Sequence, residues 1–244
     1  MTRLITIFVL LLLPWYSNSQ EVSVGLEIFP PFLNEDGTGL TVDMLREIEQ
    51  ISDLKFDVRV MTYARAKSEL HNGRLDIAGH TPKNLETQSF YQYAQELDWQ
   101  IETRSDFFTF NPKFFNINEV AQKRIGTPTG NAAFFAEQLG IDESRFIEVS
   151  TLPQLVDMLL KRRIDVLLFE RVSVMTILRE KQVKGVHYKS IGVIPASIAV
   201  AKNEKGDKLR QQLDDYIAQL DRENIFSGYL NLLVLPESGV VPIE

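Results

Sequence analysis

The sequence predicts an α/β fold built from two similar halves. Three observations lead to this prediction: strand and helix patterns alternate from Glu21 onward, the same order of patterns recurs after about residue 115, and matching short motifs stand at the same places in both halves. Alternation of the two patterns is typical of α/β folds. A repeated β-α-β-α-β order indicates two lobes of similar build.

The first half opens with Glu21 to Ile28, whose alternating residues favour a strand. Thr41 can cap the helix that follows, in which Leu45, Ile48 and Ile51 share one face. Gly73 suits the position just past the end of a second helix. The other elements expected here are a strand at 56–60, that helix at 63–72 and a buried strand at 75–79.

The second half repeats this plan. Its expected strands are 124–127, 146–149 and 164–169, and its helices are 132–139, ending at Gly140, and one whose apolar stripe is Leu152, Leu155, Val156, Leu159 and Leu160. That spacing places all five side chains on one helical face. Two pairs of motifs match between the halves: Arg74-Leu75-Asp76-Ile77 with Arg163-Ile164-Asp165-Val166, and Val24-Gly25 with Ile125-Gly126.

Two extended segments, 104–110 and 187–201, are the candidate crossovers between the halves. The C-terminal helices, about 208–222 and 225–233, would pack back on the first half. A chain that leaves a lobe and returns to it forms a hinge of two strands, with the ligand site between the lobes. The expected division is 20–108 with 197–244 for lobe 1, and 109–196 for lobe 2.

The N-terminus resembles an export signal. Arg3 supplies a positive start, Leu4 to Leu13 form an apolar run, and Ser17-Asn18-Ser19 provides small residues at the expected cleavage site. The apolar run is about half of the roughly 20 residues that span a bilayer. We therefore expect a signal peptide at 1–19, a mature chain beginning at Gln20, and a periplasmic location.

Composition narrows the possible partners. The net charge of −7 argues against nucleic acid or an anionic membrane as the main partner. The chain has no cysteine, so it lacks both the lipidation cysteine of an exported lipoprotein and thiolate metal sites. Its three histidines, His71, His80 and His187, lack ligand spacing. We expect no metal, no cofactor and no membrane anchor after cleavage of the signal.

Several motifs, in their order along the chain, resemble the family 3 extracellular solute-binding proteins. They are Val24-Gly25, Phe29-Pro30-Pro31-Phe32, Gly39, Asp43-Met44, Gly73-Arg74-Leu75-Asp76, Arg163-Ile164-Asp165 and 195–201. The resemblance covers nearly all of 20–244. It implies the type II periplasmic-binding-protein fold, with hinge closure around a small ligand. Most members serve the uptake of polar amino acids.

Loops at the carboxyl ends of strands form the ligand crevice of such sheets, so the candidate residues were sought there. In lobe 1, Phe29 and Phe32 follow the first strand, and we expect one ring in the core and one facing the ligand. The resemblance implies that Tyr63 faces the cleft and that Gly79-His80-Thr81 holds the polar head of the ligand. Arg65, near Tyr63, is equally consistent with simple solvent exposure.

In lobe 2, Thr129-Gly130-Asn131 directly precedes a helix, where amide groups attract anions. The turn lacks the lysine of a nucleotide-binding loop. Glu170 ends a buried strand, and the resemblance implies that it pairs with a ligand ammonium group. A local salt bridge to Arg171 is the competing interpretation.

One position departs from the family. An arginine that binds the ligand α-carboxylate is expected shortly after Thr81, but 82–87 contains none. Lys83 could act as a point charge but not as a planar fork. Amino acids are therefore questionable ligands, and amines and short peptides stay open.

The sequence favours capture over catalysis: a monomeric clamp that binds a small polar ligand and delivers it to an inner-membrane permease of an ABC importer. Two alternatives remain. A dehydratase-like enzyme on the same scaffold could use Glu170 as its acid. A sensory receptor could present the closed form to a signalling partner. Glu170→Gln separates binder from enzyme, because only a binder loses affinity.

Overall fold

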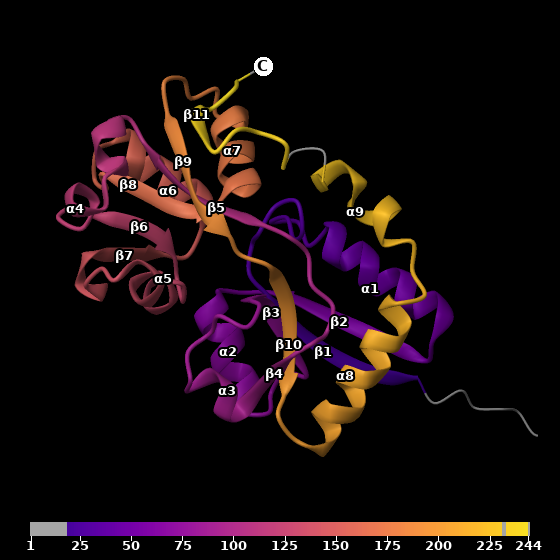
Figure 1. The fold of residues 1–244 in the computed structure, drawn as a ribbon. Coiled ribbons are helices and arrows are strands. Elements are labelled where there is room, and N and C mark those ends of the chain that lie inside the picture. The colour runs from indigo at the N-terminus through magenta and orange to yellow at the C-terminus, as the bar shows by residue number, and fades with distance from the viewer. Residues whose placement is uncertain (1–18, 231–232, 244) are drawn as a thin grey trace, which may run out of the picture.

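The computed structural model describes residues 19–230 and 233–243. The predicted signal peptide, apart from Ser19, lies outside the described residues. Within the described part, the chain forms two sheets in separate lobes, as Figure 1 shows. The predicted α/β architecture with two lobes is therefore confirmed.

The first sheet has the strand order β2-β1-β3-β10-β4. Its strands are β1 (Gln20–Leu26), β2 (Leu54–Val60), β3 (Ile77–Pro82), β4 (Ala94–Glu96) and β10 (Ala196–Ala201). Strand β1 pairs in parallel with both β2 and β3, and β10 runs antiparallel to β3 and β4. The three parallel strands end on the same edge, facing the other lobe.

The second sheet has the order β11-β9-β5-β8-β6-β7. Its strands are β5 (Arg104–Thr109), β6 (Ile125–Pro128), β7 (Phe146–Val149), β8 (Val166–Glu170), β9 (His187–Val193) and β11 (Ser238–Val240). Strands β6, β7 and β8 repeat the parallel arrangement of β1, β2 and β3. Each lobe thus directs the carboxyl ends of a parallel trio toward the cleft.

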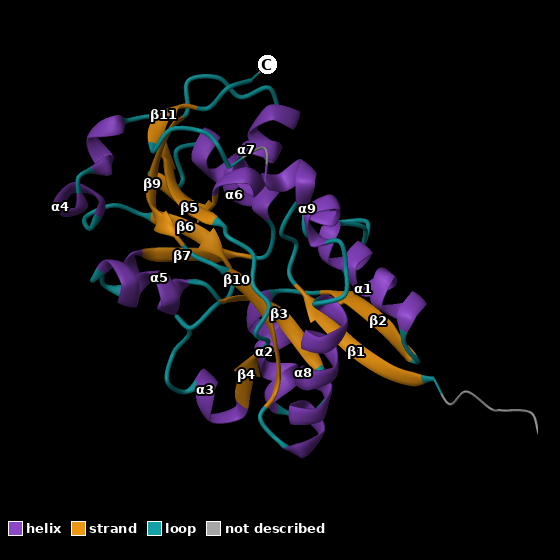
Figure 2. Ribbon diagram, turned by 45° about the vertical axis from the view of Figure 1, so that its right-hand side comes forward, coloured by secondary structure: helices purple, strands orange, loops and turns teal. Residues whose placement is uncertain are grey.

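Helices cover both sheets (Figure 2). The first lobe carries α1 (Leu40–Ile51), α2 (Tyr63–His71), α3 (Phe90–Tyr93), α8 (Glu204–Ile217) and α9 (Arg222–Leu230); the second carries α4 (Ile117–Val120), α5 (Ala132–Leu139), α6 (Leu152–Leu160) and α7 (Arg171–Glu180), with 3₁₀ turns at Pro112–Phe115 and Glu143–Arg145. Both C-terminal helices pack against α1, as predicted.

The matching motifs make equivalent contacts in the two lobes. The Asp76 carboxylate accepts a hydrogen bond from Ser23 N, and the Asp165 carboxylate accepts one from Arg124 N, both at 3.0 Å. A Cβ on Gly25 would clash with Leu75. A Cβ on Gly126 would clash in the same way with Ile164, the counterpart of Leu75 in the second lobe. The repeated letters therefore reflect a repeated packing arrangement.

The hinge consists of two neighbouring segments, 97–103 and 194–195. Ile101 and Ala196 exchange backbone hydrogen bonds of 2.8 and 2.9 Å, and Ile194 N donates to Thr103 O at 2.9 Å. Sheet membership nevertheless differs from the expected lobe boundaries. Strand β11 pairs with β9 of the second lobe, although 197–244 was expected in lobe 1. The chain therefore returns to lobe 2 after α9.

A buried ion pair lies next to the segment that follows α9 and returns to lobe 2. Arg171 pairs with Asp106 through nitrogen–oxygen distances of 2.7 and 3.1 Å, and both side chains are fully buried. Arg171 also donates to Leu235 O at 3.0 Å. The pairing that the sequence suggested between Glu170 and Arg171 does not form, because the guanidinium group is engaged by Asp106.

Candidate functional site

A cavity lies between the two sheets, where strand ends from both lobes meet. Its volume is about 40 Å³, enough for a few water molecules. A larger solute can enter only if the lobes move apart. The cavity is lined by Glu27, Phe29, His80, Thr81, Pro82, Thr103, Ser105, Asn131, Phe134, Phe135, Phe169, Glu170, Ile194, Pro195 and Ala196.

Phenyl rings form much of the cavity wall. Phe29 of lobe 1 and Phe169 of lobe 2 meet across the cleft, with their ring centroids 5.4 Å apart. Phe134 and Phe135, from α5, complete this wall. Phe32 instead lies in the core against Tyr229, at 4.5 Å. Phe29 therefore lines the cavity and Phe32 lies in the core, and the ligand-facing role of Phe29 stays a prediction.

Glu27 is the least satisfied carboxylate of the cavity. Its side chain follows β1 and is 5% exposed, and Asn131 Nδ2 donates to it at 3.4 Å across the cleft. Burial raises the pKa of Glu27 to about 8, against the smaller opposing effects of Asn131 and Lys67. Glu27 is not among the site residues that the sequence predicts. Its position directly before Ile28 and Phe29, at the carboxyl end of the first strand, was the available signal.

Glu170 is also buried, at 2% exposure, but its carboxylate is well satisfied. It caps α7 by accepting from Ser173 N and Ser173 Oγ, both at 2.8 Å. Tyr229 Oη donates to its other oxygen at 3.1 Å. Burial raises the pKa of Glu170 to about 7, and the hydrogen bonds from Ser173 oppose that rise.

His80 supplies a neutral polar group to the cavity wall. Its Nε2 lies 2.7 Å from the Thr41 hydroxyl, and its Nδ1 has no hydrogen-bond partner among the described residues. Burial lowers the pKa of His80 to about 3, so the imidazole is uncharged at neutral pH. It can therefore accept or donate one hydrogen bond to a ligand without adding charge.

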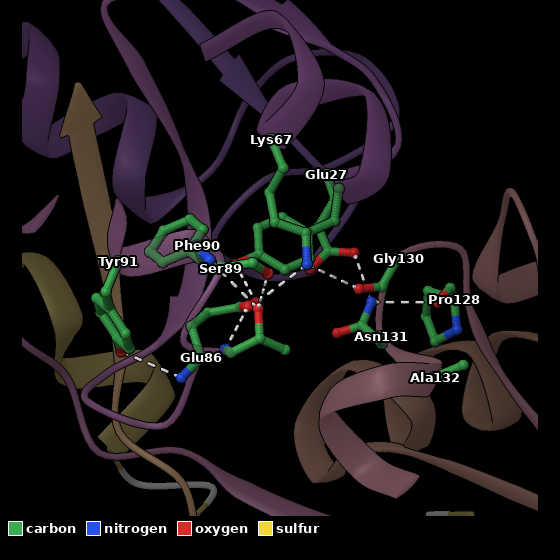
Figure 3. Close-up of polar contacts among 12 residues, drawn as sticks. Glu27, Lys67, Glu86, Ser89, Phe90, Tyr91, Pro128, Gly130, Asn131 and Ala132 are labelled. Atoms are coloured by element: carbon green, nitrogen blue, oxygen red, sulfur yellow. Dashed lines mark hydrogen bonds and ion pairs between the residues drawn. The ribbon is translucent and has the colours of Figure 1, made fainter. Parts of the chain in front are cut away.

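Several polar contacts hold the two lobes together beside the cavity (Figure 3). Lys67 Nζ lies between the lobes, 3.1 Å from Glu86 Oε1 and 3.1 Å from Gly130 O. Ala64 N donates to Thr129 O at 3.4 Å, and Ser173 Oγ donates to Pro30 O. The two lobes are therefore in direct contact in this structure.

Comparison with known proteins gives matches of structure only: no protein-family model and no curated protein matches the chain. Among solved structures, a histidine kinase sensor domain with similarity to periplasmic binding proteins superposes with a TM-score of 0.72, at 15% identity over 91% of this chain and 97% of that one. The arginine-, lysine-, histidine-binding protein ArtJ from Geobacillus stearothermophilus gives 0.71, at 16% identity over 87% and 96%.

A third match is the GluR0 ligand-binding core from Nostoc punctiforme in complex with L-glutamate. It gives a TM-score of 0.70 at 13% identity and covers 88% of this chain and 100% of that one. The chain has the periplasmic-binding-protein fold. The expected resemblance to solute-binding proteins is confirmed at the level of that fold.

Within this periplasmic-binding-protein fold, half of the predicted site residues reach the cavity and half do not. Those that line it are Phe29, His80, Thr81, Asn131 and Glu170. Those that do not are Phe32, Tyr63, Gly79, Thr129 and Gly130. For both sets, the role of these residues as ligand contacts stays a prediction.

The residues outside the cavity have other partners. Tyr63 Oη donates to Glu86 at 2.8 Å, and Gly79 lies tightly against Ile198. Thr129 and Gly130 contact the lobe 1 helix α2 through its residue Ala64. Each of these positions was predicted from its place after a strand, which fixes the loop but not the direction of the side chain.

Two basic residues that the sequence singled out also point elsewhere. Arg65 is largely exposed and pairs with Glu69 at 2.7 Å. Lys83 Nζ donates to Leu97 O, so it does not replace the missing arginine in the cavity. Among the described residues, no cluster of side chains could hold a metal ion. None of the described helices has the length and apolar character needed to cross a bilayer.

Proposed function

We propose that this chain is a periplasmic solute-binding protein that closes around a small polar ligand, without chemistry, and delivers it to an ABC-type permease. The observation that carries the proposal is the cavity itself. Glu27 and Phe29 of lobe 1 and Asn131 and Glu170 of lobe 2 line one cavity at the carboxyl ends of both parallel trios. In such sheets this edge is where ligands bind.

Closure in this structure depends on contacts that separate when the clamp opens. Lys67 with Gly130 and Asn131 with Glu27 are examples. A ligand that touches both walls favours the closed form, because only that form makes both sets of contacts. The permease would then recognise the closed shape. The fold neighbours that bind arginine, lysine, histidine or glutamate support this mode of action.

The test is thermal stability of residues 20–244 across a panel of amino acids, amines, organic acids, sugars and short peptides. The protein is first unfolded and refolded to remove any solute carried through purification. A ligand at 100 times its Kd adds about 2.7 kcal/mol and raises the Tm by a few degrees. NMR of the mixture then checks that the compound is not consumed.

A shift with no consumption supports the clamp. Consumption of the compound supports an enzyme instead. If no compound shifts the Tm of the refolded protein, the solute-binding proposal is overturned.

A further inference from the structure

We propose that the solute bound by this chain is an organic cation that carries no carboxylate, held by Glu27 against the phenyl rings of the cavity. The inference rests on the proposed function and narrows its ligand class. Three features of the molecule carry it: the acidic side chains of the cavity wall, the internal use of the nearby basic side chains and of the amides before α5, and the open hydrogen-bonding capacity of Glu27.

The wall of the cavity is acidic and lacks a cation. Of the described residues that line it, Glu27 and Glu170 are the acidic ones, and neither lysine nor arginine is among them. His80 is neutral in this environment. A ligand carboxylate here would lie beside two acidic side chains, with no lysine or arginine in the cavity wall to serve as its counter-charge. Burying an unpaired charge is costly, so the cavity disfavours such a ligand.

The basic residues around the cavity are all engaged by the protein. Lys83 donates to Leu97 O, on the side where the ligand-binding arginine was expected. Lys67 is held by Glu86 and by Gly130 O. Arg171, which follows Glu170 directly, is paired with Asp106. None of these three side chains is available to a ligand carboxylate in the closed form.

The amide groups at the start of α5 are occupied as well. The sequence suggests an anion site at Thr129-Gly130-Asn131, before this helix. The structure fills it with the carboxylate of Glu148, which accepts from Gly130 N and from Ala132 N, each at 2.8 Å. Asn131 N meanwhile donates to Pro128 O at 3.2 Å. A carboxylate of the ligand would have to displace one that the chain itself supplies.

Glu27, by contrast, is equipped to receive a cation. Its carboxylate has one long hydrogen bond, from Asn131, although it is nearly inaccessible to solvent. Phe29, Phe134 and Phe169 share the cavity with it. Aromatic faces attract ammonium, guanidinium and quaternary ammonium groups, most strongly where water is excluded. A cation beside Glu27 would therefore gain a full counter-ion and several ring faces.

The experiment compares pairs of compounds that differ by the carboxylate: agmatine with arginine, cadaverine with lysine, histamine with histidine, and choline with glycine betaine. Affinities of the refolded protein are measured by calorimetry at pH 8. We expect at least one amine to bind ten or more times tighter than its carboxylated partner.

If a carboxylated partner binds as tightly as the amine or more tightly, the inference is overturned and the proposed function stands. If none of the paired compounds binds while a neutral or anionic compound of the wider panel does, the inference is likewise overturned and the proposed function stands. If neither set binds, both proposals are overturned.

Two variants locate the site. Glu27→Gln keeps the shape and removes the charge, so we expect amine affinity to fall a hundredfold or more while the ligand-free protein melts at the same temperature or higher. Glu47→Gln removes the same charge from an exposed position on α1 and should leave affinity unchanged. Amine binding by Glu27→Gln within threefold of the parent protein would refute the role of Glu27.

Discussion

Each lobe presents one buried glutamate to the cleft, and the two differ in how fully they are hydrogen-bonded. Glu170, at the end of β8, accepts from Ser173 N and Ser173 Oγ of its own lobe and from Tyr229 Oη of the lobe 1 helix α9. Glu27, just past β1, accepts from Asn131 alone at 3.4 Å. Burial is alike in the two. What separates a structural carboxylate from one suited to a ligand is the hydrogen-bonding capacity that the protein leaves unused.

The largest expected effect comes from removing the well-satisfied glutamate. Glu170→Ala deletes the cap of α7 and leaves Ser173 and the Tyr229 hydroxyl without their buried partner. We expect a loss of about 3 kcal/mol in the free energy of unfolding, measured by urea denaturation. Glu27→Ala is the matched comparison and should cost less, because it removes only one long hydrogen bond. Equal losses in the two variants would remove the distinction between the glutamates.

The next effect is on the pH dependence of the ligand-free protein. A carboxylic acid whose pKa is higher in the folded than in the unfolded state stabilises the fold below its unfolded pKa, and that stability is lost as the pH rises through the folded value. For Glu27 the window runs from about 4.5 to about 8, and for Glu170 from about 4.5 to about 7. Stability should therefore fall between pH 5 and pH 9.

The same measurement separates the contribution of Glu27 to this pH dependence from those of the other titrating groups. Glu27→Gln should flatten the decline in the free energy of unfolding above pH 7. The stability it restores is a few kcal/mol at most, on the scale of about 1.4 kcal/mol per pKa unit. Nearby Lys67 lowers the pKa of Glu27, and nearby Glu86 raises it. His80, neutral when folded, acts oppositely and costs stability as the pH falls from 6.5 toward 3. An unchanged decline in Glu27→Gln would contradict the assigned pKa.

The smallest effect tests lobe closure. The hydrogen bond from Asn131 to Glu27 depends on closure, whereas Ser173 N donates to Glu170 within lobe 2. Gly130 has φ +102°, and a Cβ placed on it would lie 2.5 Å from Ala64 N of the other lobe. Gly130→Ala should weaken binding of the ligand about tenfold and increase the radius of gyration in X-ray scattering. Gly140→Ala imposes a similar backbone strain, at φ +63°, where nothing lies within 4 Å. Equal effects of the two substitutions would show that strain, and not closure, is responsible.

Much of the fold was predictable because it rests on local patterns. The stripe beginning at Leu152 became α6, and the matched Asp76 and Asp165 brace the first parallel strand of each lobe. Strand β11 was not predicted, because three residues with a central glycine carry no periodicity. Its place is set by backbone pairing with β9, far earlier in the chain.

The site was less predictable than the fold, because partner choice is not a local property. The turn before α5 has the composition of an anion site, and only the structure shows that Glu148 already fills it. Lys83 likewise stands close to the expected position for a ligand contact but points to Leu97 O. Strand ends could be located from the sequence, whereas the direction and the partners of each side chain depend on residues distant in the chain.

The return of the chain to lobe 2 has a practical consequence. Gln20 begins β1 in the first lobe, whereas Val240 ends β11 in the second, so residues near the two ends of the described chain lie in different lobes. A donor dye near one end and an acceptor near the other would report opening and closing as a change in energy transfer. Both labels would sit outside the cleft, and the protein could serve as its own sensor for the solute it captures.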